Sequence, residues 1–76
     1  MAGFNHDELF EPIKHKVEMG ELRTVNSLRL ILEEAGEKFD VTTLNMLLLF
    51  REWLEEKDIL LSTENGAVTF SKLSGK

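Results

Sequence analysis

The second half of this 76-residue chain is a leucine-rich helical pattern that leads directly into a β-hairpin. The helical pattern begins at Asp40, which can cap a helix, and continues to Asp58. Residues 59–63 follow at once with the character of a strand, and Asn65-Gly66 is the strongest short-range signal for a hairpin turn. We therefore predict a long helix followed by a two-stranded ribbon, with its second strand over residues 67–71.

Two further helices are predicted upstream of this unit. Asn5 can cap the first one, Phe4 is positioned to pack on Leu9, and Gly20 is a natural stop. Pro12 lacks the N–H that would bond to a carbonyl one turn earlier. The first helix therefore either kinks at this proline or is preceded by a separate short turn.

The second helix is predicted from Thr24, which can cap it, to Gly36. The connection that follows is short, as helix-turn-helix units require. Asp40 is expected to cap the third helix, with Phe39 packed on Leu44. The second and third helices should then cross at a steep angle.

At about 100° per residue, the third helix has one broad apolar face and one mixed face. The apolar face is the expected core and consists of Met46, Leu47, Leu49, Phe50, Trp53 and Leu54. The mixed face carries Asn45, Arg51, Glu52, Glu55 and Glu56, with Leu44 and Leu48 among them. Leucines on such a face indicate a docking edge, unless Phe39 covers Leu44 and the first helix covers Leu48.

Acidic residues outnumber basic ones by fourteen to nine, which gives a net charge of −5. Nucleic-acid binding depends largely on Lys and Arg that neutralise phosphates, so this balance argues against DNA or RNA. The chain has no cysteine, which excludes disulfides and gives no reason to place the protein outside the cytoplasm. Its longest apolar run, residues 46–50, is far shorter than the roughly 20 residues of a membrane span. We expect a cytoplasmic protein that does not enter a membrane.

The segment Trp53-Leu54-Glu55-Glu56-Lys57-Asp58-Ile59-Leu60 resembles the step from recognition helix to wing in the winged helix-turn-helix superfamily. The resemblance covers residues from about 24 to 73, with Asp58 where that family often has a glycine in the left-handed conformation. It implies an α+β fold in which residues 1–76 form one small winged-helix domain. Three helices are followed by a C-terminal two-stranded β-hairpin, the wing.

The resemblance also implies a DNA-binding surface at the start of the third helix and on the wing. The residues that would contact DNA are Thr42, Thr43, Asn45, Arg51 and Lys72. The glutamates of the same helix would repel phosphates, so electrostatics favours a protein partner or a homodimer instead. The residues expected in that interface are Leu44, Leu48, Arg51, Glu52 and Glu55. The alternative is a small DNA-binding transcriptional regulator that uses the third helix and the wing.

No pattern in the chain points to catalysis or to a bound cofactor. Glu11 and His15 lie four residues apart on one helical face, but one carboxylate and one imidazole make at most half of a metal site. The remaining acids are spread along helix surfaces without a positioned nucleophile and base. We therefore expect a non-catalytic module without a metal, a cofactor or a small-molecule substrate.

Overall fold

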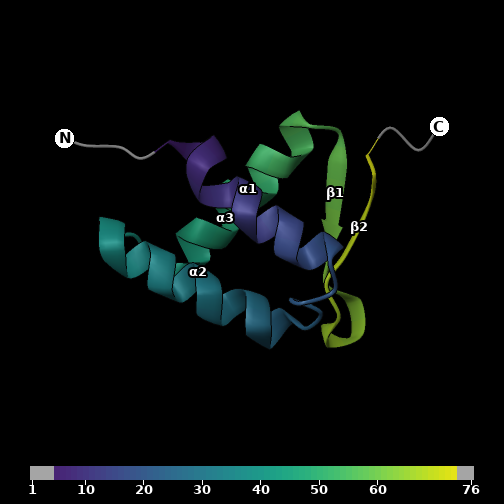
Figure 1. Cartoon of the computed structure of the whole chain (residues 1–76), viewed down its shortest axis with the longest axis horizontal. Coiled ribbons are helices and arrows are strands. Elements are labelled where there is room, and N and C mark those ends of the chain that lie inside the picture. Colours follow the sequence, from purple (N-terminus) through teal and green to yellow (C-terminus); the bar gives the residue numbers. More distant parts are fainter. Residues whose placement is uncertain (1–4, 74–76) are drawn as a thin grey trace.

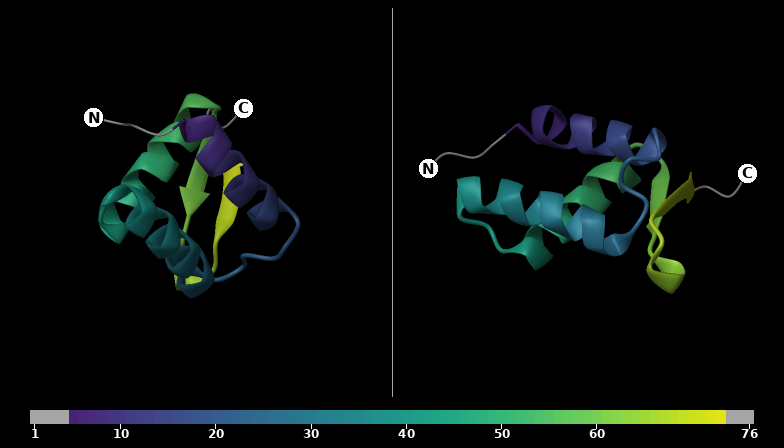
Figure 2. Two further views of the ribbon diagram at one scale, coloured as in Figure 1. Left: turned by 60° about the vertical axis from the view of Figure 1, so that its left-hand side comes forward. Right: turned by 60° about the horizontal axis from the view of Figure 1, so that its bottom comes forward.

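The computed structural model describes residues 5–73, which form three helices followed by a two-stranded antiparallel sheet (Figure 1). The elements are α1 (His6–Glu18), α2 (Val25–Phe39), α3 (Thr43–Glu56), β1 (Ile59–Ser62), a short 3₁₀ turn η1 (Glu64–Gly66) and β2 (Thr69–Lys72). The predicted α+β order is confirmed. Helix α3 crosses α2 steeply, and the ribbon of β1 and β2 stands at one side of the helices (Figures 1 and 2). No helix within residues 5–73 has both the length and the apolar character to cross a membrane.

The first helix begins where its capping residue predicts. Asn5 Oδ1 accepts a hydrogen bond from the Glu8 N–H at 3.1 Å, and α1 continues through Pro12 as one helix. The alternative of a separate turn before the proline is therefore wrong. The helix ends at Glu18, and Gly20 reverses the chain at φ +83°. Phe4 lies outside the described residues, so its predicted packing on Leu9 stays a prediction.

The junction between α2 and α3 differs from the prediction in two ways. Asp40 does not cap α3: it ends α2 in the left-handed conformation (φ 57°, ψ 43°), and its N–H bonds back to the Gly36 carbonyl. Thr42 is the cap of α3, because its Oγ1 accepts a hydrogen bond from the Asn45 N–H at 3.3 Å. This cap puts Val41, which packs against the core, at the position that precedes a cap. The predicted packing of Phe39 on Leu44 was built on the wrong cap.

Gly36 does not end the second helix but lies buried inside it. A Cβ at this position would come within 2.3 Å of the Val41 carbonyl oxygen and 3.0 Å of Met46 Cγ. The Val41 N–H also bonds to the Gly36 carbonyl at 2.8 Å. The glycine is therefore needed where the chain turns tightly from α2 into α3.

The ribbon is shorter and its loop longer than the prediction of strands over 59–63 and 67–71. Strand β1 pairs with β2 from Ile59↔Lys72 to Ser62↔Thr69. Asn65 and Gly66 both have positive φ, as a hairpin turn requires, but they lie within a longer loop that includes η1. Val68 leaves the strand because its side chain is buried and its N–H bonds to the Arg23 carbonyl at 2.8 Å.

The core lies between the three helices and the ribbon. It consists of Phe10, Ile13, Leu28, Leu32, Ala35, Met46, Phe50, Trp53, Leu54 and Val68. The predicted apolar face of α3 is confirmed, with four of its residues buried and Leu47 and Leu49 partly buried against the core. Trp53 also donates its Nε1–H to Asp7 Oδ1 at 2.7 Å, which ties α3 to the start of α1.

Candidate functional site

The outer face of α3 exposes two leucines that neither Phe39 nor α1 covers. Leu44 is 66% exposed and Leu48 is 44% exposed. They are one turn apart and form one line along the helix with Arg51 and Glu55, which follow at seven and eleven residues from Leu44. We call this line the outer stripe of α3.

The charged end of the outer stripe is largely paired within the helix. Arg51 Nε lies 3.4 Å from Glu55 Oε2, and both side chains remain partly exposed. Glu52 is exposed one turn beyond Leu48, and Glu56 follows it one turn later. The structure therefore brings all five residues of the expected protein interface onto the same exposed side of α3.

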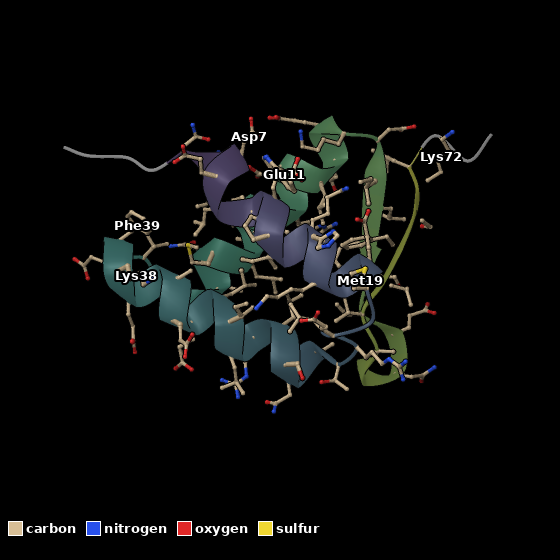
Figure 3. The ribbon with its side chains drawn as sticks, in the orientation of Figure 1. Asp7, Glu11, Met19, Lys38, Phe39 and Lys72 are labelled. Atoms are coloured by element: carbon tan, nitrogen blue, oxygen red, sulfur yellow. The ribbon has the colours of Figure 1, made fainter. Side chains whose placement is uncertain are left out.

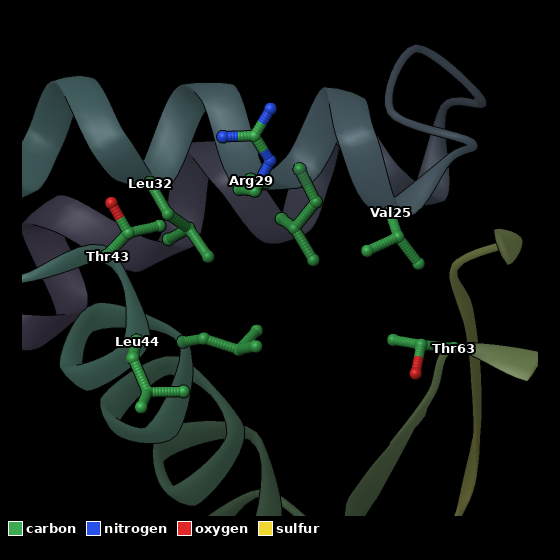
Figure 4. Close-up of a pocket in the computed structure, with 8 residues that line it drawn as sticks. Val25, Arg29, Leu32, Thr43, Leu44 and Thr63 are labelled. Atoms are coloured by element: carbon green, nitrogen blue, oxygen red, sulfur yellow. The ribbon is translucent and has the colours of Figure 1, made fainter.

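An apolar groove of about 270 Å³ opens beside the outer stripe, between α2, α3 and the ribbon (Figure 4). Its lining consists of Val25, Leu28, Arg29, Leu32, Thr43, Leu44, Leu47 and Thr63. Leu44 belongs both to the groove and to the outer stripe, so the two surfaces are continuous. In Figure 4, Thr63 faces the groove from the ribbon, across the open space from α3.

The one charged residue in the groove lining does not direct a free charge into it. Arg29 Nη2 donates to Asn26 Oδ1 at 2.9 Å, and its Nη1 lies 4.0 Å from Glu33 Oε1. Both partners lie on α2 itself, so the guanidinium is held along that helix. The groove can therefore accept apolar side chains without stripping water from a charge at its base.

The residues expected to contact DNA do not form one surface. Thr42 uses its hydroxyl to cap α3, Thr43 lines the groove, and Asn45 is exposed in the same first turn. Lys72 pairs with Ile59 at the start of β1, beside the C-terminal end of α3. The helix is 14 residues long, or about 21 Å, which separates Lys72 from the first turn of α3. Figure 3 shows the same separation between Lys72 and Phe39, which precedes that turn.

The acidic character of α3 is concentrated in its second half. Residues 51–56 carry one arginine and three glutamates, a net charge of −2. Lys57 does not offset it, because its Nζ lies 4.7 Å from the centroid of the Trp53 ring and 3.8 Å from Asp7 Oδ1, on the side that faces α1. The second half of α3 therefore carries a net negative charge, which comes from Glu52 and Glu56 beside the outer stripe.

The structure gives little support to a metal site. Within residues 5–73, no group of three or more His, Cys, Asp or Glu side chains is placed to hold a metal ion. Glu11 and His15 are both exposed on α1. The pair has the spacing noted in the sequence but lacks further ligands among the described residues.

Sequence reasoning identified the leucines but missed the groove beside them. Val25, Arg29 and Thr63 come from two different elements, and their meeting with Thr43 depends on how α2, α3 and the ribbon pack. Gly36 was a local signal for the close approach of α2 and α3 at the turn between them. The groove residues of α2 all come before Gly36 in the chain.

The chain was compared with protein-family models, with curated proteins and with solved structures. None of the three comparisons finds a match. The function therefore has to be argued from the groove and the outer stripe, because a fold alone does not carry a function.

Proposed function

We propose that this chain is a non-catalytic winged-helix domain that binds a protein, either another chain or a second copy, through the outer stripe and the groove. Three local features support the winged-helix scaffold. The ribbon follows the third helix directly, and Asp58 adopts the left-handed conformation (φ 65°) between them. Thr24 also forms an isolated bridge with Ala67, which adds a short third segment beside β2.

The observation that carries the proposal is the exposure of Leu44 and Leu48 at the edge of an apolar groove. Single exposed leucines are common on protein surfaces, but two in line beside an apolar hollow form a continuous patch. Burial of the exposed part of Leu44 is worth about 1–2 kcal/mol, and Leu48 adds somewhat less. The two leucines would supply the apolar centre of the interface, whereas Arg51, Glu52 and Glu55 would form its polar rim.

The proposal predicts that Leu48→Glu leaves the domain folded and weakens association with a partner or with a second copy. Arg51→Glu is also expected to leave the domain folded and to change association, because it reverses a charge on the rim: it weakens binding of a partner that places a carboxylate there and strengthens binding of a basic one. The measurements are solution mass and affinity capture, with circular dichroism to confirm folding. Leu30→Glu is the matched control, since Leu30 is 48% exposed on α2 and does not line the groove.

Two outcomes separate this proposal from others. Equal loss of association in Leu30→Glu and Leu48→Glu would assign the effect to added charge and refute the outer stripe as the site. Unchanged association in Leu48→Glu and Arg51→Glu would refute it directly.

The second candidate function is DNA binding, which the exposed first turn of α3 favours. Asn45 is available there, and a helix N-terminus carries positive partial charge. Titration of mixed-sequence duplex DNA at low salt tests this alternative. Binding that weakens as salt rises and is lost in Arg51→Ala would support the regulator and count against the protein-binding proposal.

A further inference from the structure

The proposed protein-binding function does not specify the chemistry of the partner. The charges around the groove indicate which class of partner fits it. We infer that the groove and the outer stripe receive a basic amphipathic helix of another protein. The apolar side of that helix would lie on Leu44, Leu48 and the groove, and its Lys or Arg residues would lie over the glutamates of α3. This inference rests on the proposed function and extends it to the class of partner.

The shape of the surface fits a helix. The groove lies between two helices, where the ridge of a third helix packs, and apart from Arg29 its lining is made of leucine, valine and threonine side chains. Leu44 and Leu48 are one turn apart, which matches the spacing of apolar residues on an incoming amphipathic helix. Helix α3 offers about 21 Å of length, enough to contact such a helix over about four turns.

The charges beside this surface favour a basic partner. Each arginine near the groove has a carboxylate on its own helix, Glu33 for Arg29 and Glu55 for Arg51. Lys57 is turned toward Asp7 and Trp53. Arg51 stays 55% exposed beside Leu48, but Glu55 counters its charge, so the net charge next to Leu48 is acidic and comes chiefly from Glu52.

A second copy of the chain fits this surface less well. Each copy carries a net charge of −5, so association brings like charges together. A basic helix instead provides a counter-charge for Glu52, Glu55 and Glu56 while it covers both leucines.

The test uses two labelled peptides of about 18 residues, long enough to form a helix when bound. Both carry leucines at positions i, i+3, i+4 and i+7, and they differ only in having Lys or Glu on the flanking positions. Fluorescence anisotropy with the full chain gives the dissociation constants at low and at physiological salt. We expect the basic peptide to bind at least about 10-fold more tightly than the acidic one, with an affinity that falls as salt rises.

Variants of the protein distinguish binding at the groove and the outer stripe from attraction to the overall negative charge of the chain. Leu44→Ala/Leu48→Ala is expected to lower the affinity for the basic peptide about 10-fold, whereas Leu30→Ala is expected to leave that affinity unchanged. Glu52→Gln/Glu56→Gln is expected to lower the affinity for the basic peptide several-fold more than Glu8→Gln/Glu11→Gln does. The second pair is the control, because it removes the same amount of charge from α1. Circular dichroism of each variant shows that the fold is retained.

The outcomes separate failure of the inference from failure of the proposed function. Equal affinity for the two peptides, or equal effects of the two glutamine variants, would overturn the basic partner. Insensitivity of the basic peptide to Leu44→Ala/Leu48→Ala would also overturn it. A dimer that Leu48→Ala dissociates, with no peptide binding, would make a second copy the occupant and leave the proposed function intact. Absence of both peptide binding and leucine-dependent association would refute the function itself.

Discussion

Replacement of Gly36 by alanine tests the packing that joins α2 to α3. In an exposed helix this change would stabilise the domain by about 1 kcal/mol, because alanine has the higher helix propensity. Here the new Cβ would lie 2.3 Å from the Val41 carbonyl oxygen, a backbone atom that side-chain rotation cannot move. Relief of the clash requires movement of the turn that holds the 2.8 Å bond between the Val41 N–H and the Gly36 carbonyl.

We expect Gly36→Ala to lower the free energy of unfolding by about 2–3 kcal/mol, because a clash with the backbone puts the cost of overpacking at about 3–4 kcal/mol, above the usual range, and the gain in propensity offsets about 1 kcal/mol of it. A domain of 76 residues has a total stability of about 4–11 kcal/mol, so the loss is a large fraction of it. Each kcal/mol lowers Tm by about 4–8 °C in a domain of this size, which predicts a drop of about 8–24 °C.

The assay is urea unfolding followed by the fluorescence of Trp53, the single tryptophan of the chain, which is 4% exposed and within 6.1 Å of the ring of Phe50. Gly66→Ala is the control, because Gly66 has a positive φ (+76°), unlike the helical Gly36, but no atom lies within 4 Å of the added Cβ. Its expected cost is only the backbone strain, about 1 kcal/mol. A Gly36→Ala variant as stable as the parent would refute the role assigned to this glycine.

Three further changes test other parts of the structure by the same unfolding assay. Thr42→Ala is expected to lower the free energy of unfolding by about 1 kcal/mol through loss of the α3 cap. Asp40→Gly is expected to maintain or raise it, because Asp40 has the left-handed conformation that glycine adopts readily. The opposite result, a larger loss in Asp40→Gly than in Thr42→Ala, would mean that Asp40 is the cap of α3. Asp7→Ala is expected to cost about 1 kcal/mol through loss of the Trp53 Nε1–H bond, and a shift in Trp53 emission without any loss of stability would contradict that. Leu44→Gln/Leu48→Gln is expected to change stability by less than about 0.5 kcal/mol per site, and a larger loss would mean that these leucines support the fold.

Local signals in the sequence predicted the fold where one physical requirement acted alone. Asn5 and Thr24 cap α1 and α2 as expected, and each side chain accepts a hydrogen bond from the backbone N–H three residues later. The 3.6-residue period also placed the buried side of α3, from Met46 to Leu54, on the correct face. In these cases the information lies within a few turns of one helix.

The failures occurred where a residue served a distant or a competing requirement. Gly36 was interpreted as a helix end, but its missing Cβ is needed for contact with Val41 and Met46. Asp40 and Thr42 are both good caps two residues apart, and the sequence alone did not distinguish the end of one helix from the start of the next. Val68 was assigned to a strand, yet its N–H is satisfied by the α1–α2 connection. The groove was not predicted for the same reason, because its lining residues come from α2, α3 and the ribbon and no single element contains it.

The leucines of the outer stripe are significant because the fold does not require them. A small domain buries a limited share of its apolar surface, and this one already has ten buried apolar residues drawn from all three helices and the chain beside β2. Leu44 and Leu48 stand outside that core, next to a groove that the core leaves open. Polar residues at these two positions would cost the fold little and would improve solubility. These observations support the proposal that the leucines serve association, and the glutamates that follow them on α3 are the reason for proposing a basic partner helix over DNA or a second copy.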